Sequence, residues 1–126
     1  MANDDDAPLG DVANRLLFSN EMVNVWEMQL EPGETSDRHR HDHPYLLCVL
    51  EGTSVDATQQ GRPGRVHIPV QPGSVFFVPP GATETAINAS DTRFREILIE
   101  LKGPLPADGL NVAVANIPAP AERRDA

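Results

Sequence analysis

Glycine and proline recur at short intervals along almost the whole of this sequence. The 126 residues include 12 prolines and 9 glycines, and no stretch between them shows a helical apolar repeat of useful length. Both residues interrupt long helices and favour turns. Only 5% of the residues are aromatic, so the core has to be built mainly from valine, leucine and isoleucine. The sequence therefore predicts an all-β fold of short strands.

Strand-like segments follow one another at intervals of roughly eight to twelve residues. In the first of them, Val23 and Val25 alternate with Trp26 and Met28, and a turn follows at the sequence "EPGE". The other predicted strands lie in the segments "YLLCVLEGTSV", "VHIPV", "QPGSVFFVPPGA", "TETAINAS" and "TRFREILIELK". This spacing is typical of an all-β sandwich or barrel. The length suits one compact core and is too short for two ordinary domains.

The chain divides into three parts. Residues 1–12 carry three consecutive aspartates and are predicted to form a flexible acidic tail. Residues 13–103 contain the predicted strands and are expected to form the barrel. Residues 104–126 form a C-terminal extension, in which "LNVAVANI" (residues 110–117) is expected to add a strand to a sheet edge or to a partner subunit. We therefore expect a homodimer.

The charge of the chain narrows the classes of partner. The formal net charge is −9 and no block of lysine and arginine stands out, so nucleic acid is not an expected partner. No apolar run approaches the roughly 20 residues of a membrane span, and the N-terminus is acidic where a signal peptide is basic. We expect a cytoplasmic protein without a membrane partner. The single cysteine, Cys48, fits a reducing compartment and a buried packing role.

Three of the four histidines lie at alternate positions in "SDRHRHDHPYLL", residues 36–47. In an extended strand His39, His41, His43 and Tyr45 share one face, because side chains two residues apart point the same way. Two imidazoles at this spacing can bind a divalent metal if a further ligand comes from elsewhere in the chain. Solvated histidines on a surface strand are the alternative that the spacing alone leaves open.

The spacing around these histidines resembles the first motif of the cupin superfamily, usually written G-x5-H-x-H-x(3,4)-E-x6-G. Gly33, His39, His41 and Gly52 occupy the corresponding positions. Tyr45 stands where the motif has its glutamate. One position of the first motif therefore departs from the pattern.

A second stretch resembles the other cupin motif, G-x5-P-x-G-x2-H-x3-N. Gly73, Pro79, Gly81 and Asn88 match it, and Glu84 stands where the motif has its histidine. The two motifs together extend the resemblance to most of the chain. It implies a small single-domain jelly-roll barrel of about six to eight strands with its site inside.

The resemblance also implies a ligand set. His39, His41 and Glu84 would form a site of two histidines and one carboxylate with open positions for water or substrate. Such a set suits Fe(II), and also Mn(II), Ni(II) or Zn(II). Tyr45 is then a fourth ligand, a hydrogen-bond donor to substrate or part of the barrel lining, and His43 is a reserve ligand.

Two functions from different classes follow from the resemblance. The first is a metal-dependent enzyme of the dioxygenase, isomerase, decarboxylase or lyase type, acting on a small organic acid, diketone or similar chelator bound in the barrel. In a proton-transfer reaction Glu84 or Tyr45 would be the catalytic acid or base. The alternative is a non-catalytic, metal-free cupin that binds a small molecule, because both motif departures alter the ligand set.

Other polar residues are weaker candidates for a site. His67 lies between apolar neighbours in "RVHIP" and is expected to face solvent. Arg93 and Arg95 would either reach an anionic substrate or form surface pairs with Glu96 or Glu100. Such surface pairs contribute little to stability.

Overall fold

In the computed structural model of the protein, residues 8–103 are described, and all regular structure in this range is β-strand. The strands are β1 (Arg15–Ser19), β2 (Val23–Leu30), β3 (His39–Arg40), β4 (Tyr45–Glu51), β5 (Ser54–Gln59), β6 (Val66–Pro69), β7 (Val75–Val78), β8 (Thr83–Ile87) and β9 (Phe94–Leu101). The all-β prediction is confirmed. Among the described residues no helix has the length and apolarity needed to cross a bilayer.

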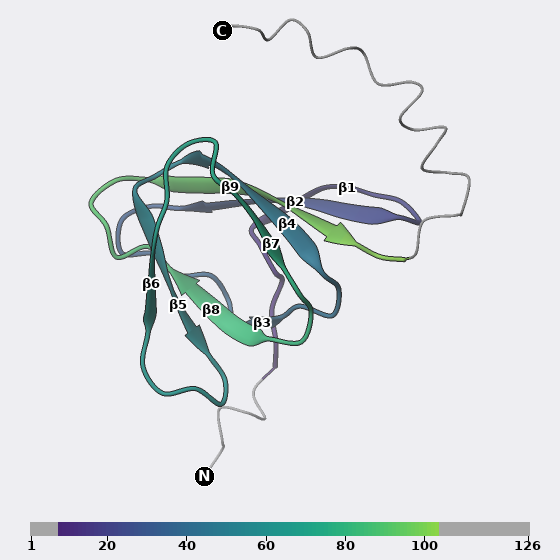
Figure 1. Ribbon diagram of the computed structural model, residues 1–126, viewed down its shortest axis with the longest axis horizontal. Coiled ribbons are helices and arrows are strands. Elements are labelled where there is room, and N and C mark those ends of the chain that lie inside the picture. Colours follow the sequence, from purple (N-terminus) through teal and green to yellow (C-terminus); the bar gives the residue numbers. More distant parts are fainter. Residues whose placement is uncertain (1–7, 104–126) are drawn as a thin grey trace, which may run out of the picture.

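The strands form two sheets that face each other across the interior (Figure 1). One sheet has five strands in the order β1-β2-β9-β4-β7, and the other has four strands in the order β3-β8-β5-β6. All pairings within both sheets are antiparallel. The connection from β4 to β5 passes from one sheet to the other, and so does that from β7 to β8. This is the two-sheet jelly-roll arrangement that the sequence predicted.

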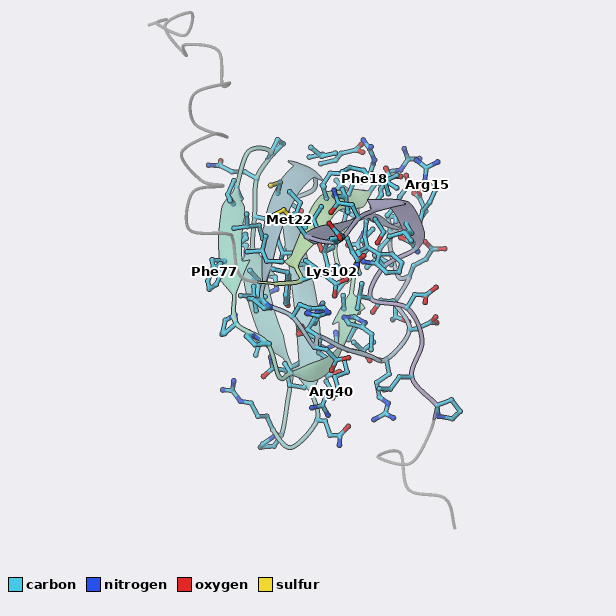
Figure 2. The ribbon with its side chains drawn as sticks, turned by 90° about the vertical axis from the view of Figure 1, so that its right-hand side faces the viewer. Arg15, Phe18, Met22, Arg40, Phe77 and Lys102 are labelled. Atoms are coloured by element: carbon cyan, nitrogen blue, oxygen red, sulfur yellow. The ribbon has the colours of Figure 1, made fainter. Side chains whose placement is uncertain are left out.

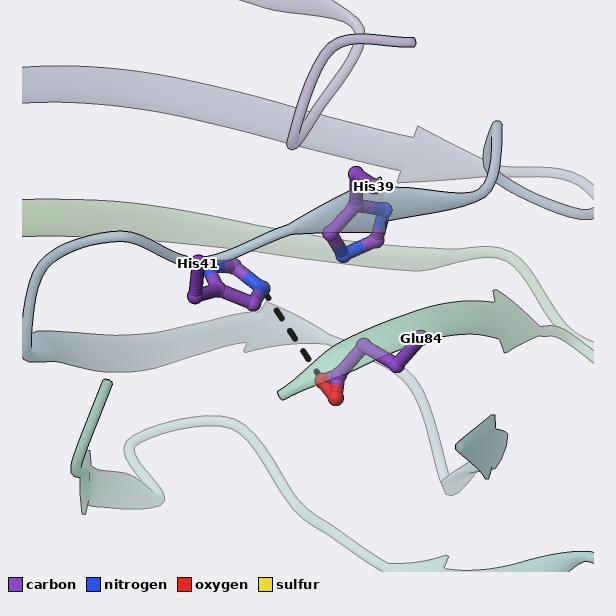
Figure 3. Close-up of side chains that lie close together, drawn as sticks. All are labelled: His39, His41 and Glu84. Atoms are coloured by element: carbon purple, nitrogen blue, oxygen red, sulfur yellow. Dashed lines mark ion pairs between the residues drawn. The ribbon is translucent and has the colours of Figure 1, made fainter. Parts of the chain in front are cut away.

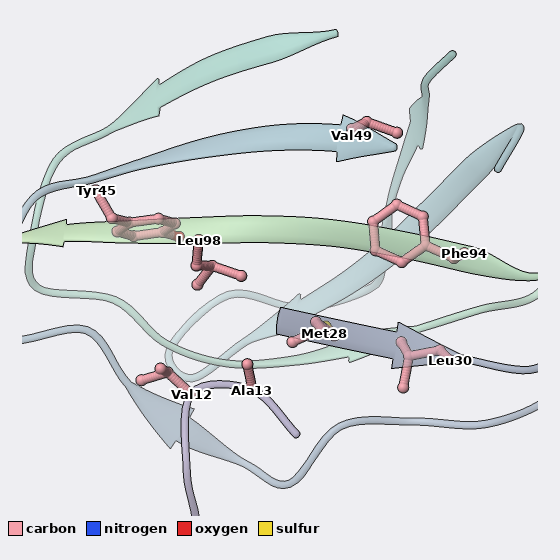
Figure 4. Close-up of a cluster of buried hydrophobic side chains, with 8 residues drawn as sticks. All are labelled: Val12, Ala13, Met28, Leu30, Tyr45, Val49, Phe94 and Leu98. Atoms are coloured by element: carbon pink, nitrogen blue, oxygen red, sulfur yellow. The ribbon is translucent and has the colours of Figure 1, made fainter. Parts of the chain in front are cut away.

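A cluster of buried apolar side chains fills the space between the sheets (Figure 4). It consists of Val12, Ala13, Met28, Leu30, Tyr45, Val49, Phe94 and Leu98. Phe94 is completely buried. Gly52 lies directly beside it with a φ of +129°, and a Cβ at this glycine would come within 3.0 Å of the Phe94 ring. Cys48 is only half-buried, contrary to expectation, because its position on β4 faces outward.

The outer face of the five-stranded sheet carries an apolar row that crosses all of its strands. Successive pair registers align Phe18 with Val25, Val25 with Ile99, Ile99 with Leu46 and Leu46 with Phe77. Phe18 is 54% exposed and Phe77 is 62% exposed. Figure 2 shows Phe77 at the periphery of the molecule. This row contributes little to the described core.

The N-terminal segment that the sequence predicted to be a flexible tail, residues 1–12, is described from residue 8 onward. Gly10 donates a backbone hydrogen bond of 2.8 Å to the carbonyl of Arg38, and Val12 is 8% exposed. The end of this segment therefore packs against the barrel next to the histidine segment. The C-terminal extension, residues 104–126, lies outside the described residues, and the strand and dimer contact expected at residues 110–117 lie there with it.

Candidate metal centre

The histidine segment is held to the four-stranded sheet by backbone hydrogen bonds. In the ladder between β3 and β8, His39 lies directly opposite Glu84. Beyond the strand, His41 donates its amide hydrogen to Ala82 and accepts a hydrogen bond of 2.8 Å from Gly81, whose φ is +114°. A positive φ of this kind favours glycine. The backbone therefore fixes both imidazoles relative to the strand that carries Glu84.

Alternation along the segment sends the imidazoles inward. His39 and His41 are each 2% exposed, whereas Arg40 and Asp42 are exposed. This is the two-residue period expected of extended backbone. His43 is half-buried and does not belong to the group of converging side chains described next.

His39, His41 and Glu84 bring one potential ligand atom each to the same point, and these atoms all lie within 4.8 Å of one another (Figure 3). The Nε2 atom of His41 is 3.9 Å from a carboxylate oxygen of Glu84. Two buried imidazoles and one carboxylate form a donor set suited to Fe(II), Mn(II), Ni(II) or Zn(II). The residues present therefore fit a divalent transition metal.

The ring nitrogens of the two histidines have different surroundings. Nδ1 of His39 lies 2.8 Å from the carbonyl oxygen of Asp37, so it donates to that oxygen and leaves Nε2 free as a ligand. Nδ1 of His41 is buried and has no hydrogen-bond partner among the described residues. Burial, and then the charge of His39, lower the pKa of His41 to about 3. His41 is therefore neutral near pH 7, the state that binds metals.

Tyr45 contacts two of the converging side chains. Its ring stacks on His41 with a centroid distance of 3.9 Å and an interplanar angle of 19°. Its hydroxyl donates a hydrogen bond of 3.4 Å to Glu84. Burial, followed by the charge of Glu84, raises the pKa of Tyr45 above its ordinary value, so the hydroxyl keeps its proton. Tyr45 thus lies where it can position the imidazole and the carboxylate.

We expect Tyr45→Phe to weaken metal binding by roughly 10-fold, the lower end of the range for residues that orient metal ligands. The phenyl ring preserves the stacking on His41, while the hydrogen bond to Glu84 is lost. The measurement is competition with a chromophoric chelator for Zn(II). Unchanged affinity would show that the hydroxyl does not orient the carboxylate.

Two carboxylates that the sequence suggested as possible surface partners of Arg93 and Arg95 lie inside the barrel. Glu96 is 6% exposed and Glu100 is 4% exposed, because β9 alternates with Phe94 and Leu98 on its inner face. Glu100 accepts hydrogen bonds from Trp26 at 2.8 Å and from Asn24 at 3.0 Å. The other side of β9 carries Ile97, Ile99 and Leu101, so alternation within this strand alone did not reveal which side faces inward.

The surface pairs expected for the arginines form with different partners. Arg93 lies 2.8 Å from Glu31 and Arg95 lies 2.8 Å from Glu27. Glu96 and Glu100 are out of reach because strand alternation turns them inward.

The expected solvent exposure of His67 is confirmed. Its side chain is 65% exposed. Nδ1 of this histidine lies 2.7 Å from a carboxylate oxygen of the buried Asp56.

A cavity of about 70 Å³ adjoins the three converging side chains and is also lined by Tyr45 and Glu96. Its wall on the five-stranded sheet includes Met28, Leu47 and Leu98. Sites for drug-sized ligands occupy roughly 300–1,000 Å³. This cavity suits a metal ion with water or a very small organic molecule.

The metal-free protein should lose stability between about pH 6.5 and 8. Burial, and then the charge of Glu84, raise the pKa of Glu96 from 4.5 to about 8. The folded state therefore retains a proton that the unfolded chain releases, and the free energy of unfolding falls as pH rises through this window, by about 1.4 kcal/mol per pH unit. Below about pH 6.5 the unfolded chain binds a proton at His41 that the folded state does not bind, because the pKa of His41 is lowered. This contribution raises the free energy of unfolding as pH rises.

Urea unfolding of metal-free protein at several pH values between 6.5 and 8 measures this slope. Glu96→Gln cannot release the proton and should flatten it. A slope that survives this substitution would assign the effect to another group.

The fold and the site together define a small jelly-roll barrel with a buried group of side chains on its inner face that could bind a metal. The family model described as a cupin domain matches residues 26–100, more than half of the chain. The chain therefore belongs to the cupin family.

Similar proteins extend this comparison. Beta-alanine degradation protein BauB of Pseudomonas aeruginosa is 36% identical over 72 residues, which cover 56% of this chain and 73% of that protein. A crystal structure of a cupin domain from Bordetella pertussis Tohama I is 26% identical, with a TM-score of 0.64 over 75% of this chain and all of that one. A Cupin 2 conserved barrel domain protein from Salinispora arenicola CNS-205 has a TM-score of 0.55 at 18% identity, covering 93% of this chain and 97% of that one. The last likeness concerns the fold alone.

Proposed function

We propose that this cupin is a metal-dependent enzyme that holds a divalent transition metal with His39, His41 and Glu84 and acts on a small organic molecule in the barrel. The observation that carries the proposal is the convergence of three potential ligand atoms to within 4.8 Å of one another. Support also comes from the similarity to BauB, whose name assigns that protein to the degradation of β-alanine, a small organic molecule.

The side chains around the triad have complementary roles in this proposal. When bound, the metal would supply a Lewis acid that polarises an oxygen of the bound molecule. Burial keeps the imidazole of His41 neutral, and the hydroxyl of Tyr45 orients Glu84. Glu84 is the candidate base and Tyr45 the candidate acid for proton transfer, since both border the cavity. The apolar side chains of Met28, Leu47 and Leu98 border the same cavity.

Metal uptake tests the proposal directly. The purified protein is stripped with a chelator, incubated separately with Fe(II) under anaerobic conditions, Mn(II), Ni(II) or Zn(II), desalted and analysed by mass spectrometry of the elements. We expect about one equivalent of at least one of these metals. Less than about 0.1 equivalent of all four would overturn the proposal. Glu84→Gln, which keeps the shape and removes the charge, should reduce the uptake.

One observation favours the second candidate function, a metal-free barrel that binds a small molecule without chemistry. The hydroxyl of Tyr45 already donates to Glu84, so this carboxylate has a protein partner without a metal. Ligand binding by protein that takes up no metal would support this alternative.

A further inference from the structure

The cavity is lined by three acidic side chains, Asp56, Glu84 and Glu96, and the described residues that line it include no lysine or arginine. Asp56 already pairs with Arg65 at 3.4 Å and with His67 at 2.7 Å. Glu84 accepts from Tyr45 and belongs to the metal-binding group. Glu96 alone is left without an assigned partner.

Glu96 lies in the centre of the five-stranded sheet, opposite Met28 on β2 and Val49 on β4. Its side chain is 94% buried, and no hydrogen bond from residues 8–103 to its carboxyl oxygens is present in the structure. These oxygens are not among the fully enclosed unpartnered atoms. Its carboxyl group borders the cavity. Glu100, two residues along the same strand and equally buried, has two donors. The missing donors distinguish Glu96 from its neighbour.

An ionised carboxylate without a partner is unfavourable when buried, and in the absence of a bound molecule Glu96 therefore keeps its proton near pH 7. A bound molecule that supplies donors or positive charge can replace this proton. A protonated amine supplies both. The aliphatic side chains of Met28, Leu47 and Leu98 border the same cavity and can contact a short alkyl chain. A simple carboxylate anion would instead meet the charge of Glu84.

We propose that Glu96 is the recognition residue for a protonated aliphatic amine, and that the molecule bound in this cavity carries an ammonium group. The sequence suggested a small organic acid, a diketone or a similar chelator as substrate. The proposal restricts these candidates to compounds that carry a positively charged group. The inference rests on the proposed function for the position of the site, and it does not require that the metal be present.

The experiment compares ethylammonium, ethanol and acetate, which are similar in size and differ in charge. Affinities are measured by NMR titration of the zinc-loaded protein and of the metal-free protein. We expect ethylammonium to bind at least about 10-fold more tightly than ethanol, as is typical of hydrogen bonds between charged groups. Glu96→Gln should abolish this preference. Glu100→Gln is the matched control and should change the preference by less than about twofold.

A direct measurement on the unaltered protein complements the variants. The ¹³C resonance of the Glu96 carboxyl should shift on addition of ethylammonium and not on addition of ethanol. The absence of this shift, or an ethylammonium preference that persists in Glu96→Gln, would overturn the proposal. Tighter binding of acetate than of ethylammonium to the metal-free protein would overturn it as well.

Zinc content separates this inference from the proposed function. If Glu96→Gln loses zinc while Glu100→Gln retains it, Glu96 is a metal ligand and the amine proposal is wrong. If the unaltered protein takes up no metal but still prefers ethylammonium through Glu96, the proposed metalloenzyme fails and the amine site stands.

Discussion

Replacing both His39 and His41 with alanine should abolish metal retention and leave the barrel folded. The substitution removes two of the three converging ligands, so the affinity should fall by far more than the roughly 100-fold that changes around a ligand produce. The apolar cluster between the sheets includes neither histidine. The measurements are elemental analysis after reconstitution and circular dichroism of the same sample.

His67→Ala is the matched control for this double substitution. Its imidazole is 65% exposed and does not belong to the group of converging ligand atoms, so metal content should not change. If the double variant unfolds, His39 and His41 are structural residues, and the interpretation of the site as a metal centre loses its main support.

Phe94→Ala should lower the free energy of unfolding by about 3–5 kcal/mol. The phenyl ring is completely buried and lies among the largest core side chains, so its removal leaves a cavity that the close-packed sheets cannot fill. Since small domains are stable by only about 5–15 kcal/mol, this is a large fraction of the total. Urea unfolding followed by tryptophan fluorescence measures the change.

Phe77→Ala provides the comparison, because it removes the same ring from a position that is 62% exposed. We expect a loss of no more than about 0.5 kcal/mol, as for other surface substitutions. A loss as large as that of Phe94→Ala would indicate that the apolar row on the outer sheet face is covered in solution.

The three side chains of the candidate metal centre were predicted from the sequence, the two histidines and Glu84 for different reasons. The alternation of His39 and His41 follows from backbone geometry and needs only that the segment be extended. Glu84 is distant in the sequence, and only the spacing of the second cupin motif indicated that it joins them. Periodicity within one segment cannot reveal a partner from another strand.

The buried carboxylates show where local pattern was insufficient. Glu96 and Glu100 are charged residues in a strand with isoleucine at alternate positions, so the apolar side of β9 was not evident from its composition. The pairing of β9 with β2 and β4 decides which side faces inward. That choice depends on tertiary structure and is not encoded in the strand alone.

Two strands were missed for related reasons. β1 (Arg15–Ser19) has no inward apolar alternation, and all five of its residues are exposed. β5 (Ser54–Gln59) contains Asp56, a residue type that is rare in strands, and this side chain is tolerated because Arg65 and His67 pair with it. The burial of Val12 was also not predicted. This residue follows a run of aspartates, and the side chains that it contacts belong to distant parts of the sequence.

The ladder between β3 and β8 sets residue 84 opposite His39 through main-chain hydrogen bonds. The backbone position of residue 84 is consequently independent of which side chain it carries. Exchange of one amino acid for another with a different donor atom would alter the preferred metal without a new scaffold. Residue 84 is thus a position at which one substitution would change the donor set of this barrel and leave its backbone in place.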